Sequence, residues 1–324
     1  MTTLVTGGSG FIGSHLVDFL ADETDERIIV LDDFSTGSRE NLSAFDRLET
    51  VQGDVRDAAV VADCVERADA VYHLAAAVGV KRIVDNPLES LQTNLRGTEN
   101  VLDAAARDGT PVFIASSSEV YGKSEAIPFA EPDDRVLGPT DTPRWGYATA
   151  KAADEFLALA YHDERDLPVV VARFFNTVGP RQTGQYGMVI PTFVEQALAG
   201  EPLTVYGDGT QTRCFTHVHD AVRAIYELMN EPDAHGEVFN VGAPDPTSVN
   251  DLARRVIELA ESDSEITHVP FEEVYGPDFE EPDRREPDVT KLRETIGWAP
   301  EGDLDRILVD VIEERTGRED TTDA

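Results

Sequence analysis

A tyrosine and a lysine spaced one helical turn apart could transfer protons in this chain of 324 residues. Between Tyr147 and Lys151 the spacing brings an ammonium group next to a phenol, and the cation favours the phenolate form. A tyrosine of ordinary pKa, near ~10, is a poor base at neutral pH, but one with a lowered pKa could deprotonate a hydroxyl. Ser117 and Glu119 add a hydroxyl and a carboxylate. We therefore predict Ser117, Glu119, Tyr147 and Lys151 as catalytic residues.

Three glycines near the N-terminus predict a phosphate-binding turn. Gly7, Gly10 and Gly13 follow an apolar strand at 2–6 and open a helix with apolar residues at helical spacing at 11–20. A backbone without Cβ lets a pyrophosphate approach closely, and the free amides and the helix dipole hold its charge. The sequence therefore predicts a dinucleotide at this turn.

The acidic residues after the second predicted strand favour NAD over NADP. Asp32 follows the predicted strand at 27–31, where a carboxylate accepts both ribose hydroxyls of NAD. Asp33 adds a second negative charge, and no arginine accompanies it, so the 2'-phosphate of NADP would be repelled. Asp54, after the third strand, could accept a hydrogen bond from adenine and is equally a common turn residue. NAD is therefore the predicted cofactor.

Strands and helices alternate along the first half of the chain, which predicts an α/β fold with a Rossmann-type, doubly wound parallel sheet. We expect strands at 2–6, 27–31, 50–53, 70–74, 111–115, 168–174 and 238–241, and helices at 11–20, 57–66, 88–107, 145–162, 190–198, 218–230, 250–261 and 304–314. The pattern changes after Asn176, where a turn-rich stretch begins. We expect residues 1–176 to form the NAD-binding domain, with about 212–242 returning to it, and residues 177–324 to form a smaller α/β substrate lobe.

The chain is strongly acidic, with 63 Asp and Glu against 27 Lys and Arg and a formal net charge of -36. This charge argues against nucleic acid and anionic membranes as partners. The acidic residues are spread along the chain, which suggests a solvated surface adapted to high salt rather than a docking patch for a basic partner.

Neither a membrane segment nor a metal site is expected from the sequence. It contains no run of eighteen apolar residues, and its start does not resemble a signal segment, so we expect a cytoplasmic protein. The two cysteines, Cys64 and Cys214, lie far apart and match no metal or redox spacing. We interpret both as small buried apolar residues.

Several ordered motifs give the chain a resemblance to the extended short-chain dehydrogenase/reductases, in particular to the NAD-dependent nucleotide-sugar epimerase/dehydratase family of UDP-glucose 4-epimerase type. The resemblance covers nearly the whole length. The motifs are the segments 6–13, 73–76, 116–122, 173–176, 179–181 and 285–288, together with Asn94, Tyr147 and Lys151.

The resemblance, together with the residue patterns above, implies two sets of binding residues. The NAD set is Gly7, Gly10, Phe11, Ile12, Gly13, Asp32, Asp33, Ser35, Asp54, Val55, Leu74, Ala75, Ala76, Asn94, Tyr147 and Lys151. The nucleotide-sugar set is Ser117, Ser118, Asn176, Val189, Arg213 and Arg285, with segments 189–191 and 203–205 lining the nucleotide pocket. Family members also pair through two long helices, so a homodimer through 88–107 and 145–162 is expected.

The family resemblance leaves the reaction open. Ser117, Tyr147 and Lys151 would suffice for 4-epimerisation through a transient 4-keto sugar, and segment 174–180 most resembles UDP-sugar epimerases, so we predict a UDP-sugar 4-epimerase. Glu119 instead suits 4,6-dehydratases and UDP-glucuronate decarboxylases, in which a carboxylate acts near C5. Ser118, in place of an acid, argues against a thymidine-sugar dehydratase. The missing arginine-rich segment before Tyr147 argues against a decarboxylase.

Two further classes fit the sequence less well. An NADP-dependent carbonyl reductase would need a basic residue near Asp32. A non-catalytic NAD sensor would not need Tyr147 and Lys151.

Overall fold

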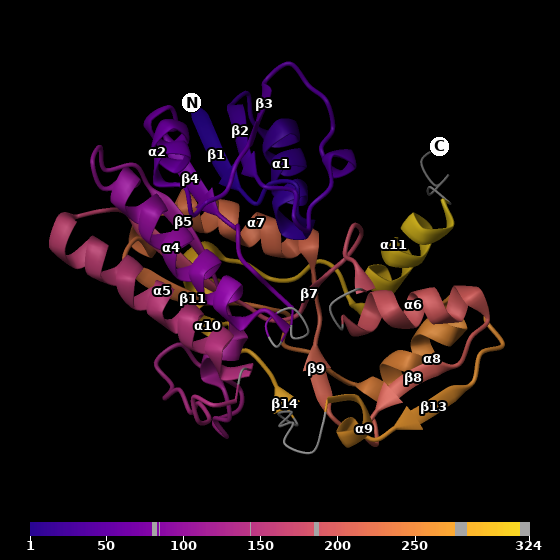
Figure 1. Cartoon of the computed structure of the whole chain (residues 1–324). Coiled ribbons are helices and arrows are strands. Elements are labelled where there is room, and N and C mark those ends of the chain that lie inside the picture. The colour runs from indigo at the N-terminus through magenta and orange to yellow at the C-terminus, as the bar shows by residue number, and fades with distance from the viewer. Residues whose placement is uncertain (80–82, 84, 143, 185–187, 276–283, 318–324) are drawn as a thin grey trace.

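The computed structural model describes residues 1–79, 83, 85–142, 144–184, 188–275 and 284–317. Its main layer is a seven-stranded parallel sheet with the order β11-β6-β5-β4-β1-β2-β3 (Figure 1). The strands are β1 (Thr2–Thr6), β2 (Arg27–Asp32), β3 (Leu48–Gln52), β4 (Ala70–His73), β5 (Val112–Ser117), β6 (Val169–Phe174) and β11 (Glu237–Val241). This order, with its reversal between β1 and β4, confirms the predicted Rossmann-type fold.

Helices cover both faces of this sheet because its central strands are apolar on both sides. They are α1 (Phe11–Glu23) and α7 (Val218–Met229) on one face, and α2 (Ala58–Glu66), α4 (Pro87–Ala105) and α5 (Arg144–Arg165) on the other. Leu16 of α1 and Ile225 of α7 belong to one buried cluster, and Val101 of α4 and Ala158 of α5 belong to a second. The strand ends that carry the predicted site are therefore fixed by two separate cores.

A second lobe has its own core and lies at the lower right of Figure 1. Its larger elements are α6 (Val189–Ala199), β8 (Leu203–Tyr206), α8 (Val249–Leu259), β13 (Ile266–Val269), α9 (Phe271–Tyr275) and α11 (Leu304–Thr316). The shorter elements of the described residues include the strands β7 (Thr177–Val178), β9 (Thr212–Cys214), β10 (Thr216–His217), β12 (Pro246–Ser248) and β14 (Arg284–Arg285), and helix α10 (Thr290–Ile296). Between these segments the chain returns to the main sheet through α7 and β11.

The structure adds several elements that the sequence did not predict. Strands β8 and β13 pair in parallel, and β9 pairs with both β12 and β14. These strands have two to four residues, too few for a period-two pattern to stand out. The pairing of β14 with β9 places Arg285 opposite Arg213. Two predicted substrate-binding arginines are thus brought together from distant parts of the chain.

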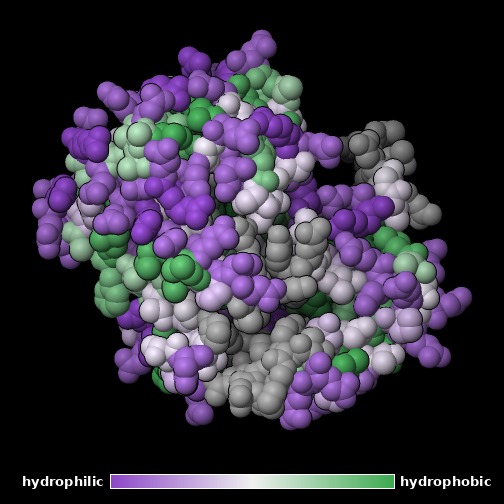
Figure 2. Space-filling model, in the orientation of Figure 1, coloured by the Kyte–Doolittle hydropathy of each residue, from purple (hydrophilic) through white to green (hydrophobic). Residues whose placement is uncertain are grey.

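The surface is mostly hydrophilic on the face drawn in Figure 2, with an apolar area over α4 and α5. Leu88 of α4 and Phe156 of α5 are among the exposed large apolar residues. A search of the described residues finds no helix that is long and apolar enough to span a membrane.

We expect the protein to be destabilised in dilute buffer, because a net charge of -36 repels itself when counterions are scarce. Raising KCl from dilute to molar concentration should increase the melting temperature by roughly 5 °C, a gain of about 3 kcal/mol for a chain of this size. Thermal unfolding followed by circular dichroism measures this. Sucrose serves as control, since it strengthens burial without screening charge. Equal stability with and without salt would contradict the high-salt interpretation.

Candidate active site

A cavity of about 560 Å³ lies where β1, β4, β5 and β6 end and the second lobe begins. This is the switch point of the sheet, where open α/β folds bind ligands. Every predicted site residue except Asn94 lines it: Gly7, Gly10, Phe11, Ile12, Gly13, Asp32, Asp33, Ser35, Asp54, Val55, Leu74, Ala75, Ala76, Ser117, Ser118, Glu119, Tyr147, Lys151, Asn176, Val189, Arg213 and Arg285. The fold therefore gathers residues from both lobes around one space.

The glycine turn is too tight for side chains. A Cβ added at Gly13 would lie 2.2 Å from the Gly7 carbonyl oxygen, and Gly7 itself has a φ of +69°. Next to the turn, the Asp32 carboxylate accepts hydrogen bonds from the Ser9 N–H at 2.9 Å and the Phe34 N–H at 2.8 Å. The turn thus forms a side-chain-free cradle with a fixed carboxylate at its edge, which fits the pyrophosphate and ribose of NAD.

Replacing Gly10 with alanine tests this cradle without breaking the turn. Gly10 has an ordinary φ of -76°, and a Cβ there would lie 3.2 Å from the Gly7 oxygen, so only a small adjustment is needed. The methyl group would face the cavity, and we expect the NAD affinity to fall about tenfold, or about 1.4 kcal/mol. Calorimetric titration with NAD measures the affinity. Unchanged affinity at unchanged stability would place the pyrophosphate elsewhere.

Two predicted cofactor residues have other partners in the structure. The side-chain oxygen of Asn94 accepts from the Ala77 N–H at 2.7 Å, and its amide donates to the Ala77 carbonyl, so Asn94 holds the chain after β4 and does not line the cavity. Asp54 lines the cavity, but Arg56 binds its carboxylate at 2.5 Å and holds its pKa below the usual range. Asp54 is a turn residue in the structure, with the Arg56 N–H as a further donor.

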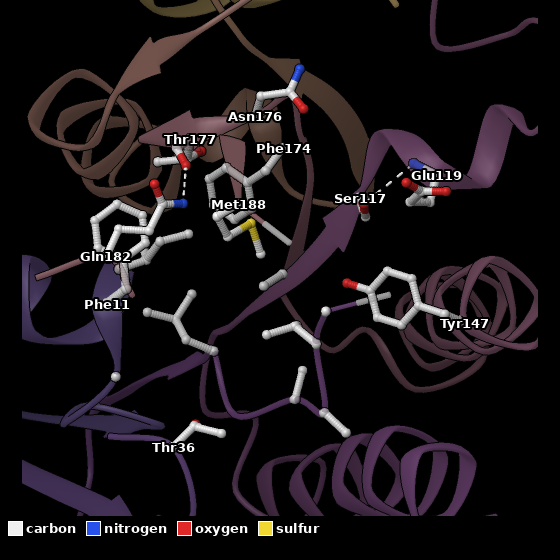
Figure 3. Close-up of a pocket in the computed structure, with 18 of the residues that line it drawn as sticks. Phe11, Thr36, Ser117, Glu119, Tyr147, Phe174, Asn176, Thr177, Gln182 and Met188 are labelled. Carbon is white, nitrogen blue, oxygen red and sulfur yellow. Dashed lines mark hydrogen bonds between the residues drawn. The ribbon is translucent and has the colours of Figure 1, made fainter. Parts of the chain in front are cut away.

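The Tyr147 hydroxyl points into the cavity, on the side where Ser117 and Glu119 lie (Figure 3). Burial and the negative charge of Glu119 raise the pKa of Tyr147, while a hydrogen bond with Ser117 acts in the opposite direction. Lys151 instead donates to the Ala115 carbonyl oxygen at 2.8 Å. In the chain by itself, burial therefore keeps the pKa of Tyr147 raised, and the predicted contribution of Lys151 to the phenolate stays a prediction.

Glu119 is bound by an arginine from the far end of the chain. The turn that follows β5 is fixed by the Glu119 N–H, which donates to Ser117 Oγ at 3.2 Å. Arg285 Nη1 then donates to Glu119 Oε1 at 2.5 Å. Arg285 is buried and lies opposite Arg213 in the β14–β9 pair. A carboxylate and two arginines thus stand on the cavity wall next to the predicted proton-transfer residues.

The two segments predicted to line the nucleotide pocket contribute only some of their residues. Leu203 and Val205 are fully buried in the core of the second lobe, whereas Thr204 and Tyr206 line the cavity. Side chains alternate along a strand, so a strand at this position can present only every second residue. In the helical segment 189–191, Val189 lines the cavity and its two successors are buried.

Several residues that line the cavity were not predicted, because their residue types alone do not indicate a catalytic or binding role. They are Phe174, Thr177, Gln182, Met188, Gln211 and Phe271, some of which appear in Figure 3. Tyr121, in contrast, does not line the cavity. Its ring stacks on Phe129, and its hydroxyl donates to Asn240 Oδ1 at 2.7 Å, so it packs.

Comparisons with known proteins agree with this arrangement. The model of the NAD dependent epimerase/dehydratase family matches residues 3–242. The chain is 42% identical to a UDP-N-acetyl-alpha-D-glucosaminuronate decarboxylase from Bacillus cytotoxicus, over 96% of both chains. It is 39% identical to UDP-glucuronic acid decarboxylase 6 from Arabidopsis thaliana, over 93% of this chain and 84% of the relative.

Solved structures of similar proteins extend the agreement to the fold. A UDP-N-acetylglucosamine 4-epimerase from Methanobrevibacter ruminantium superposes with a TM-score of 0.88 at 30% identity, over 98% of this chain and 99% of the other. The UDP-glucose 4-epimerase of Thermotoga maritima gives 0.87 at 31% identity, with the same coverage. The chain is therefore an NAD-dependent enzyme that belongs to the epimerase/dehydratase family of the extended short-chain dehydrogenase/reductases.

Proposed function

We propose that the enzyme decarboxylates a UDP-hexuronate, with UDP-N-acetylglucosaminuronate as the first candidate and UDP-glucuronate as the second. The observation that carries the proposal is the ion pair of Glu119 and Arg285 at the cavity wall, next to Ser117 and Tyr147. A 4-epimerase has no need of a carboxylate at this position. The two decarboxylase relatives named above support the same choice. This replaces the 4-epimerase predicted from the sequence.

The first step is the oxidation of the sugar at C4. NAD bound at the glycine turn supplies reversible hydride transfer at this carbon. Tyr147, acting as the base, takes the proton of the C4 hydroxyl, and Ser117 donates a hydrogen bond to the same oxygen. Because burial raises the pKa of Tyr147, the phenolate needs added positive charge, which the oxidised nicotinamide carries.

The second step breaks the bond between C5 and C6. A ketone at C4 is β to the C6 carboxylate, so CO2 can leave while the bonding electrons pass into an enolate with its charge on the C4 oxygen. Ser117 and the protonated Tyr147 donate hydrogen bonds to that oxygen. Glu119 delivers to C5 a proton drawn from solvent, and Arg285 orients both Glu119 and the departing carboxylate. Tyr147 returns its proton to the C4 oxygen, and the pentose product would result once bound NAD supplied the hydride back to C4.

The remaining predicted residues could bind the ribose of NAD and the diphosphate of the UDP-sugar substrate. Asp32 would accept the ribose hydroxyls of NAD. Arg213 would bind the diphosphate of the substrate, since its planar group can donate two parallel hydrogen bonds. Asn176 is held by its amide, which donates to the Cys214 carbonyl at 2.9 Å. A homodimer through α4 and α5 would cover the exposed Leu88 and Phe156.

Product analysis tests the proposal. The enzyme is incubated in molar KCl with UDP-N-acetylglucosaminuronate, UDP-glucuronate, UDP-glucose or UDP-N-acetylglucosamine, and the products are read by mass spectrometry and NMR. We expect one or both uronates to lose the mass of CO2 and the neutral sugars to stay unchanged. The 4-epimerase alternative, which the two superposed epimerases support, predicts a new isomer of a neutral sugar at unchanged mass.

A further inference from the structure

Lys151 is paired inside the protein with an acidic residue of its own helix. Asp154 lies one turn further along α5, and its Oδ2 is 3.5 Å from Lys151 Nζ. Both residues are almost fully buried, with 2% exposure for Lys151 and 1% for Asp154. Water therefore screens these charges poorly, and each acts on its neighbours more strongly than it would at the surface. The proton transfer proposed for Tyr147 does not by itself require this carboxylate.

The next acidic residue of α5 is already neutralised. Glu155 is bound by Arg173 of β6, with Nη2 2.7 Å from Glu155 Oε2 and Nε 2.9 Å from Oε1. The Ser116 hydroxyl also donates to Glu155. The charge of Glu155 is thus compensated by Arg173, and these contacts join α5 to β5 and β6. The charge of Asp154, in contrast, is directed at Lys151.

The elements packed against this part of α5 face Asp154 with neutral groups. Thr98 of α4 lowers the pKa of Asp154, and neither carboxylate oxygen of Asp154 has a hydrogen-bond partner within the described residues. Behind Thr98, the Nε2 of His73 of β4 lies 3.3 Å from Thr98 Oγ1, and His73 Nδ1 lies 2.8 Å from Thr6 Oγ1. Burial lowers the pKa of His73 to about 3, so its ring is neutral at working pH. Among these neighbours, Lys151 is the cation that compensates the negative charge of Asp154.

We propose that Asp154 is a charge-tuning residue of the active site, whose carboxylate holds Lys151 and offsets the ammonium charge that would otherwise act on Tyr147. The inference rests on the proposed role of Tyr147 as the base. Asp154 does not line the cavity, so it acts through Lys151 and is a positioning residue rather than a catalytic one. It sets how strongly Lys151 favours the phenolate.

The direction of the effect follows from two pKa shifts. Burial raises the pKa of Asp154 to about 6, against the lowering by Lys151 and Thr98. After burial and Glu119, the charge of Asp154 also contributes to the raised pKa of Tyr147. Below about pH 6, Asp154 is protonated and the ammonium acts fully on the phenol. Above it, the carboxylate opposes the phenolate.

The variant Asp154→Asn keeps the side-chain shape and removes the charge, and Asp154→Ser is a second neutral variant. Asp163→Asn, at an exposed position of the same helix, is the matched control. Tyrosinate absorbance of the NAD-saturated proteins, corrected with Tyr147→Phe, reports the titration of Tyr147 without any turnover. We expect both neutral variants to lower its apparent pKa by about one unit. The control should titrate like the parent enzyme.

The pH profile of decarboxylation provides the second readout. The ratio of the Asp154→Asn rate to the parent rate should be close to one at low pH, rise severalfold above pH 6 as Asp154 ionises, and fall again once Tyr147 is deprotonated in both. A shifted tyrosine titration in a protein that decarboxylates no uronate would keep this inference and overturn the proposed substrate. Active, folded variants with unchanged titration and an unchanged profile would leave Asp154 a purely structural role.

Discussion

The variant Tyr147→Phe should lose nearly all turnover, with kcat lower by roughly a thousandfold. Phenylalanine keeps the ring that fills the cavity wall but has no oxygen to take the proton from the C4 hydroxyl. Without that proton transfer the hydride cannot leave C4, so the first step fails for every substrate. Steady-state assays of product formation measure the loss.

The contrast between activity and binding makes this test specific. Calorimetric titration should show NAD affinity within about threefold of the parent, less than 1 kcal/mol, because the glycine turn and Asp32 are untouched. Tyr161→Phe is the control, since Tyr161 lies on the same helix and its hydroxyl donates to Asp103, away from the cavity. A Tyr147→Phe enzyme that retains a tenth or more of the parent rate would rule out this tyrosine as the base.

The local parts of the site could be predicted from the sequence because they depend on neighbouring residues. The glycine turn, Asp32 at the end of β2, and the spacing of Tyr147 and Lys151 are each contained in one strand, turn or helix. The sequence pattern of such a segment is enough to indicate its local geometry. The cavity is lined by all of these residues, as expected.

Contacts between distant segments could not be predicted in this way. Glu119 and Arg285 are 166 residues apart and meet only because a two-residue strand, β14, pairs beside β9. The electrostatics depend on the same packing: burial raises the pKa of Tyr147, although a lysine at helical spacing suggested the opposite. Asn94 is one of the family's motif residues, but its side chain is hydrogen-bonded to the backbone of Ala77. Only the folded structure shows this contact.

The variant Glu119→Gln should separate the two halves of the proposed reaction. The amide keeps the size of the side chain but cannot deliver a proton to C5, so turnover to the pentose product should slow by roughly a hundredfold to a thousandfold. Tyr147, Ser117 and Lys151 remain, and oxidation at C4 should continue. Reduced cofactor should therefore accumulate on mixing with a UDP-hexuronate, as read by its absorbance in a stopped-flow experiment. Glu125→Gln, at an exposed position soon after Glu119, is the matched control.

Glu119→Gln also changes the partner of Arg285, so its effect on protein stability must be separated from its effect on the reaction rate. Losing a hydrogen bond to a charged group costs about 1.5–3 kcal/mol, so the variant should melt at a lower temperature, and assays belong well below that transition. A 4-epimerase would use only Ser117, Tyr147 and Lys151, and its rate on a neutral UDP-sugar would survive this substitution. Full activity of Glu119→Gln would therefore exclude the proposed decarboxylase mechanism. The carboxylate would then have no part in the protonation of C5, which decarboxylation needs and 4-epimerisation does not.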